Sequence, residues 1–196
     1  MSADTLPHEV RHEIEVKHSR FLAIAAPADS PEAAMAFIAA VSTADATHNC
    51  WAWRIGGLYR SSDDGEPAGT AGRPILAAID GQGFDQVAAV VTRWYGGIKL
   101  GAGGLVRAYG GCAAECLRTA PRQALIEYRE LHLRYPFEHT GAVHAALAQH
   151  GAEKLGETFD AAGARLHLRL PAERSDALQV HLRDASRDQV RVADEP

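Results

Sequence analysis

The sequence of 196 residues predicts an α+β fold divided between two domains. Strand-like and helix-like apolar patterns alternate in the first part of the chain, where the clearest strand is the β-branched run Val87–Thr92. After Pro121 the patterns change and follow the order β-α-β-β-α-β in about 70 residues, which is the ferredoxin-like arrangement of two helices on an antiparallel sheet. We therefore expect one domain over residues 1–124 and a second over 125–196.

In the first domain, apolar alternation over residues 12–26 indicates two strands or one bent strand. Ser30 is a favoured N-cap residue, and Met35, Ile38 and Val41 form the apolar stripe of the helix that it would begin. The elements expected after this helix are strands at 50–55 and 58–60, a polar loop at 61–73, a helix at 74–80, a strand at 87–94 and a helix at 105–119 that Pro121 stops.

In the second domain, an alanine-rich helical segment ends at Gly151, a residue that favours helix C-termini. The other segments alternate like strands or carry helical spacing. The elements expected there are strands at 124–135, 152–159, 164–170 and 188–193 and helices at 139–150 and 171–185.

Composition limits the classes of protein that the chain can be. The formal net charge is −5, which argues against a wholly basic nucleic-acid coat protein but leaves room for a local basic patch. No apolar run reaches the roughly 18 residues of a membrane span, and the N-terminus lacks the apolar segment of a signal peptide. We expect a cytoplasmic protein with reduced thiols, no membrane partner and no cofactor.

The segment 93–111, RWYGGIKLGAGGLVRAYGG, is the most distinctive part of the chain. Glycine loses more conformational entropy on folding than other residues, so seven of them at a strand-to-helix junction need a reason. The segment does not match a Walker A motif, because Leu100 follows Lys99, and it does not match the dinucleotide fingerprint, because Val106 stands at the last glycine position. Close packing of a tight turn and the binding of an anion at the start of the following helix both remain possible explanations.

Under the anion hypothesis, a phosphate or nucleic acid would meet basic side chains and closely approaching backbone. The predicted residues are Arg73, Arg93, Lys99 and Arg107, with the glycines Gly96, Gly97, Gly101, Gly103 and Gly104.

A second loop places Asp63, Asp64 and Glu66 within four residues. This density suggests Mg²⁺, but no EF-hand pattern is present, and Asp-Gly and Glu-Pro are ordinary turn sequences, so we predict no metal site. The rest of this loop contributes Gly69, Thr70 and Gly72, and if it faced 96–104 the two segments would line one cleft.

Cysteine chemistry is the remaining possibility. His48 and Cys50 could form a base and a nucleophile, but two residues on one face of a strand are not thereby in catalytic geometry. Cys112 and Cys116, four apart, could share a helix face as metal ligands, although small buried side chains are the simpler interpretation. We predict no catalytic residue.

Four segments of the sequence resemble the IMPACT/YigZ family. Lys17–Phe21 is similar to its opening K-x-S-x-F, and Ala46–Cys50 to its A-x-H-x-C segment. DDGEPAGTAG at 63–72 and GGIKLGAGGLVRAY at 96–109 are similar to its two signature segments. Trp94-Tyr95 departs from the usual Tyr-Phe.

The resemblance implies a first domain like domain 2 of ribosomal protein S5 and a second domain similar to domain V of elongation factor G. Eukaryotic members regulate translation by binding a partner of a stress-responsive kinase. The resemblance therefore leads us to expect a non-enzymatic protein that binds RNA, the ribosome or a translation-related protein. One alternative is an enzyme for a small molecule or a phosphate ligand, in which Asp63, Asp64, Glu66, Thr70 and His48 surround a cleft between the two signature segments. Another is a protein-interaction module that uses the exposed sheet of the second domain.

Overall fold

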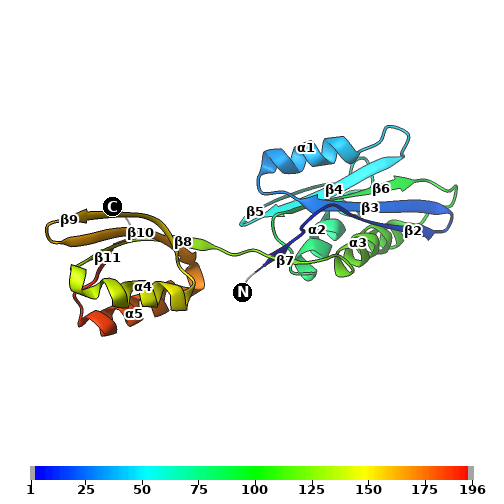
Figure 1. Cartoon of the computed structure of the whole chain (residues 1–196). Coiled ribbons are helices and arrows are strands. Elements are labelled where there is room, and N and C mark those ends of the chain that lie inside the picture. The colour runs from blue at the N-terminus through cyan, green and yellow to red at the C-terminus, as the bar shows by residue number, and fades with distance from the viewer. Residues whose placement is uncertain (1–2, 194–196) are drawn as a thin grey trace. The chain divides into compact units, whose positions relative to one another are not determined.

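The computed structural model describes residues 3–193, and the chain divides into two compact units, Met1–Leu125 and Ile126–Pro196. Each unit has its own sheet and its own helices (Figure 1). No helix in the described range 3–193 is long and apolar enough to cross a membrane.

The first unit is built on an antiparallel five-stranded sheet with the strand order β2-β3-β6-β4-β5. Helix α1 packs on one face of this sheet, and α2 and α3 pack on the other (Figure 1). The strands are β2 (Val10–Val16), β3 (Ser19–Pro27), β4 (His48–Ile55), β5 (Leu58–Ser62) and β6 (Val87–Trp94), and the helices are α1 (Pro31–Val41), α2 (Gly72–Gly81) and α3 (Ala102–Arg118). A short second sheet pairs β1 (Asp4–Thr5) with β7 (Gln123–Ala124), which the sequence did not predict.

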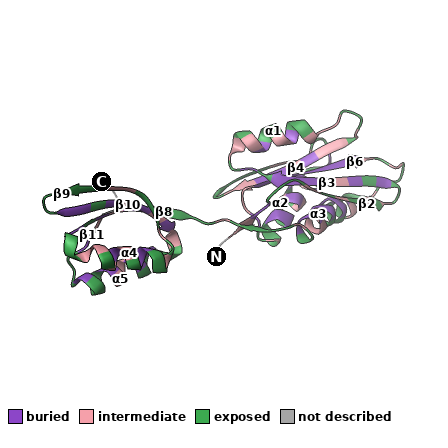
Figure 2. Ribbon diagram, in the orientation of Figure 1, coloured by how far each residue is buried: buried purple, intermediate pink, exposed green. Residues whose placement is uncertain are grey.

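The central strand β6 explains why its sequence is continuously apolar. It has helices on both sides, so its side chains are buried on both faces through Arg93 (Figure 2). On the α1 face Val90 packs with Ile38 and Trp53, whereas on the other face Val91 belongs to the core that α2 and α3 share.

Helix α1 begins as predicted, and Ile38 and Val41 of its predicted stripe pack toward the sheet. The Ser30 side chain accepts a hydrogen bond from the Ala33 N–H at 3.2 Å. Ala34 and Ile38, one turn apart, are the buried residues of the helix, whereas Met35 is exposed. The predicted stripe was therefore wrong at Met35, which lies about 100° around the helix from Ala34.

The second unit has the strand order β11-β8-β10-β9, with α4 and α5 on one face of the sheet (Figure 1). Its elements follow the predicted order β-α-β-β-α-β. They are β8 (Tyr128–Tyr135), α4 (Thr140–His150), β9 (Glu153–Asp160), β10 (Gly163–Pro171), α5 (Ser175–Ser186) and β11 (Arg191–Ala193), with short 3-10 turns at Phe137–His139 and Ala172–Arg174. The second helix begins later than predicted, because Pro171 completes β10 and the 3-10 turn precedes α5.

Candidate functional site

One end of the five-stranded sheet brings both signature segments together. Strands β5 and β6 end there and β4 begins there, and the register places Arg93 of β6 opposite His48 of β4. The loops 63–71 and 95–101 both leave the sheet from this end, and each leads into the N-terminus of a helix. The two segments therefore meet, as the sequence could only suggest.

The Glu66 carboxylate is the centre of the contacts between them. Its Oε1 accepts hydrogen bonds from Arg93 Nη1 at 2.7 Å and from the Tyr109 hydroxyl at 2.8 Å, and His48 Nε2 lies 3.9 Å away. The side chains of Glu66 and Arg93 are only 4% and 7% exposed, so each charge depends on the other. Arg93, which the sequence placed among the phosphate contacts, is thus engaged inside the protein.

Cys50 and Tyr109 line the same buried cluster. The Cys50 thiol donates to the Asp63 carbonyl, with 3.0 Å between Sγ and the oxygen. Burial raises the pKa of Cys50 to about 12 and also raises the pKa of Tyr109. A thiol with so high a pKa has almost no thiolate at neutral pH, so this geometry does not make Cys50 a nucleophile.

The acidic residues of the second loop hold the loop in shape. The Asp63 carboxylate accepts hydrogen bonds from the backbone N–H groups of Gly69, Ala71 and Gly72. Burial opposes ionisation of Asp63, but these three bonds outweigh it and lower its pKa. No group of three or more His, Cys, Asp or Glu side chains within residues 3–193 is arranged to hold a metal ion.

The neighbouring residues of this loop also make internal contacts. The Asp64 carboxylate accepts a hydrogen bond from the Asn49 backbone N–H at 2.6 Å. The backbone carbonyl oxygen of Asp64 lies 2.7 Å from His48 Nδ1. The buried Thr70 donates from its hydroxyl to the Pro67 carbonyl.

Several glycines are required by the backbone. A Cβ on Gly72 would lie 2.7 Å from the backbone of Ser62, and one on Gly96 would lie 2.0 Å from the backbone of His18. Gly97 and Gly101 have positive φ values of 88° and 73°, which suit glycine. Close packing thus accounts for part of the glycine pattern.

The start of α3 is the part of this end that stays open. Its N-cap residue, Gly101, has no side chain, so no side-chain cap binds the first N–H groups of the helix. Lys99, two residues before Gly101, and Arg107, in the second turn of α3, are both exposed, and Arg73 is exposed at the start of α2. None of the three forms an ion pair with a side chain of residues 3–193. Gly103 and Gly104 lie in the first turn of α3.

Sequence reasoning grouped His48 with Glu66 only in the enzyme alternative, and it missed Tyr109, which joins Glu66 across 43 residues of sequence. The available signal was the spacing of Tyr109 from Leu105 and Cys112, which puts it on the buried face of α3.

Comparisons with known proteins were consistent with one another. A family model described as the Impact N-terminal domain matches residues 17–117. An IMPACT family member of Thermus thermophilus is 54% identical over 156 residues, covering 80% of this chain and 86% of that protein. IMPACT family member YigZ of Escherichia coli is 39% identical over 185 residues, covering 91% and 90%. A crystal structure of a protein described only as hypothetical matches with a TM-score of 0.66 at 37% identity, covering 97% of this chain and 96% of that one.

Proposed function

We propose, from the premise that this chain belongs to the IMPACT family, that it is a non-enzymatic cytoplasmic protein that binds RNA of the translation machinery. The binding surface in this proposal is the open start of α3 with Arg73, Lys99 and Arg107. The implied likeness of the two domains to ribosomal protein S5 domain 2 and elongation factor G domain V supports a ribosomal context, as an analogy of fold.

The observation that carries the proposal is the contrast between two sets of polar groups. Glu66, Arg93 and Asp63 are occupied by internal hydrogen bonds, whereas Lys99 and Arg107 are exposed beside an uncapped helix start. Helix N-termini and cations both favour phosphate, and phosphate contacts supply much of the affinity of proteins for nucleic acids.

A salt titration of RNA binding tests the proposal. Lys99→Ala and Arg107→Ala should each weaken binding, and each should reduce the slope of log K against log[salt] by about 0.7–0.9 for a lost phosphate contact. Arg118→Ala is a matched control. Arg118 lies on the same helix as Arg107, about 16 Å further along the helix axis, and it already forms an ion pair with Glu115. If both variants keep wild-type affinity and slope, this surface does not bind RNA.

The alternative of a small-molecule enzyme has one specific observation in its favour. The His48 side chain is 22% exposed, so the Glu66–His48 pair has some access to solvent. A thermal-shift panel of nucleotides, sugar phosphates and Mg²⁺ tests this alternative, since a ligand at 100 times its Kd stabilises a protein by about 2.7 kcal/mol. A shift that His48→Ala abolishes would favour the enzyme over the RNA-binding protein.

A further inference from the structure

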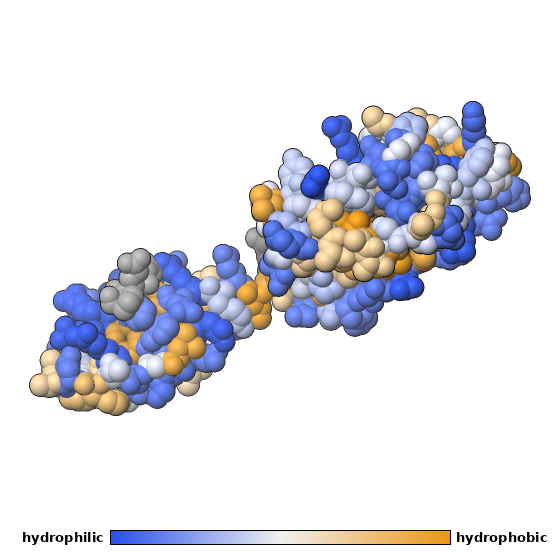
Figure 3. Space-filling view, turned by 90° about the horizontal axis from the view of Figure 1, so that it is seen from above, coloured by the Kyte–Doolittle hydropathy of each residue, from blue (hydrophilic) through white to orange (hydrophobic). Residues whose placement is uncertain are grey.

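We propose that the open face of the four-stranded sheet in the second unit is a separate binding site for single-stranded RNA. Side chains alternate along a strand, so the leucines of β8 and β10 that pack under α4 and α5 fix which residues point the other way. Leu133 and Leu166 are buried in that core, and therefore Arg134 and Arg165 stand on the open face. This face is viewed from above in Figure 3, where hydrophilic residues surround a smaller hydrophobic area.

Three arginines form a continuous row across this face. Arg134 of β8 is paired in register with Arg191 of β11 on one side and with Arg165 of β10 on the other. Like charges directly opposite one another destabilise a sheet, so such a row needs anions close by.

The anions within the protein satisfy this row only weakly. Asp160 is shared by Arg134 at 3.7 Å and Arg165 at 3.5 Å, and Asp188 lies 3.8 Å from Arg191. These distances exceed the roughly 2.7–2.9 Å of a charge-assisted hydrogen bond, and exposed pairs of this kind contribute little. The guanidinium groups thus remain available to phosphates.

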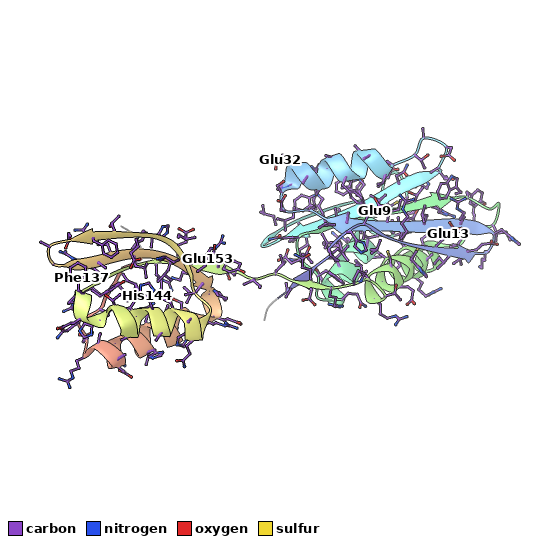
Figure 4. All side chains as sticks on the ribbon, viewed as in Figure 1. Glu9, Glu13, Glu32, Phe137, His144 and Glu153 are labelled. Carbon is purple, nitrogen blue, oxygen red and sulfur yellow. The ribbon has the colours of Figure 1, made fainter. Side chains whose placement is uncertain are left out.

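The other charged residues at this site are already paired or point away. Glu130 Oε2 lies within hydrogen-bond distance of His167 Nε2, at 2.7 Å. Arg169 Nη2 donates a hydrogen bond to Glu153 Oε2 at 2.6 Å. Glu157 points to the helix side, where it contacts Tyr135 and His144 of α4, the latter labelled in Figure 4. The exposed arginines of the row are therefore the cations of the open face that lack a close ion-pair partner.

Flat rings lie in the next row of the sheet. His132 and His167, opposite one another on the central strands, stack with 4.3 Å between ring centroids and 9° between planes. Beyond His167 the register places Gly156 of β9, where a Cβ would meet nothing within 4 Å. These residues and the arginine row line one hollow of about 570 Å³.

The hollow combines a planar ring beside open space with a row of cations two residues away along each strand, on the same face of the sheet. A nucleobase could stack on the His167 ring over Gly156 while its phosphates met the arginines. RNA-binding sheets stack unpaired bases on flat side chains in this way. Proteins that bind single strands generally combine such stacking with a positively charged groove that follows the phosphate backbone. A duplex hides its bases, and an acidic peptide has no base to stack, so a single-stranded nucleic acid fits best. The choice of RNA over DNA rests on the proposed function.

The test measures binding of a fluorescent single-stranded RNA octamer to the full-length protein carrying Lys99→Ala and Arg107→Ala. This background removes the contacts of the proposed function, so the two proposals fail or succeed separately. Gly156→Leu should weaken binding by about 5- to 150-fold, the range for one lost base stack, with little change in salt slope. Arg134→Gln and Arg165→Gln should each reduce the slope by about 0.7.

Arg183→Gln serves as a matched control, because Arg183 is an exposed arginine on α5, behind the sheet, and should leave affinity and slope unchanged. Gly156 does not have a positive φ, so leucine causes no backbone strain there, and the two arginine variants are surface changes that test the proposal independently. Wild-type affinity in all three variants overturns the proposal. Equal competition by polyglutamate or by duplex RNA also overturns it, because neither offers an unstacked base.

Discussion

At the scale of single residues, the buried Glu66 carboxylate links three elements of the first unit. It joins the loop after β5 to Arg93 on β6 and to Tyr109 on α3. Removing one partner of a buried ion pair leaves the other charge without compensation, which costs about 3–5 kcal/mol. We expect Glu66→Ala to lower the free energy of unfolding by this amount in urea denaturation.

The control for Glu66 is Glu9, which is labelled in Figure 4 and forms an exposed ion pair with Arg11. Glu9→Ala should change the free energy of unfolding by less than about 0.5 kcal/mol, as surface changes usually do. Equal losses of unfolding free energy in the two variants would mean that the buried contacts of Glu66 stabilise the protein no more than an exposed ion pair does.

The three cysteines should be unreactive in the folded protein. Burial raises the pKa of Cys50 and Cys116 to about 12 and that of Cys112 to about 11, so the reactive thiolate is scarce at neutral pH. We expect slow labelling by a disulfide reagent at pH 7 and reaction of all three thiols in denaturant. Rapid labelling of Cys50 in the native protein would contradict this structure of the site and reopen the nucleophile hypothesis.

Asp63 should make part of the stability depend on pH. Its pKa is lower in the folded protein than its ordinary value of about 3.9, so its contribution is complete above that pH and is lost as the pH falls through the folded value. Asp63→Asn should cost about 1–2 kcal/mol at pH 7 and less at pH 3. Urea unfolding at the two pH values measures this, and an equal cost at both would show that the charge of Asp63 does not matter.

At the scale of elements, two glycines of the same segment should respond to alanine with opposite signs. Gly96→Ala would place a methyl group 2.0 Å from the backbone where β2 turns into β3, so we expect a loss of more than about 2 kcal/mol. Gly111 is exposed inside α3 with nothing within 4 Å, and there alanine should stabilise by about 0.5–1 kcal/mol. Thermal unfolding of both variants checks the prediction, and equal effects would contradict it.

The same contrast explains what could be predicted from the sequence. The strand Val87–Trp94 and the cap at Ser30 follow from local patterns, and the structure confirms both. The sequence predicts Gly111 inside a helix and Gly96 in the loop before it, but no local pattern shows that the backbone of His18 lies against Gly96. Pairing of β1 with β7 and the bond from Tyr109 to Glu66 also depend on contacts distant in sequence.

At the scale of the whole molecule, each unit has a core of its own. In the first unit, helices cover both faces of the sheet. In the second unit, α4 and α5 cover one face, and the other face carries the RNA site proposed above. A domain that buries its own apolar surface should fold alone, although the smaller unit is close to the size at which stability becomes marginal. We therefore expect the fragments 1–125 and 126–196 to fold separately.

Circular dichroism and urea unfolding of the two fragments test this expectation. Each fragment should show a cooperative transition, with the steeper dependence on urea in the larger one, because it exposes more surface on unfolding. If fragment 126–196 folds, it should also bind the single-stranded RNA octamer and lose that binding with Gly156→Leu. A fragment that remains unfolded at low temperature would show that its sheet depends on the other unit, and the two proposed sites would then have to be studied only in the intact chain.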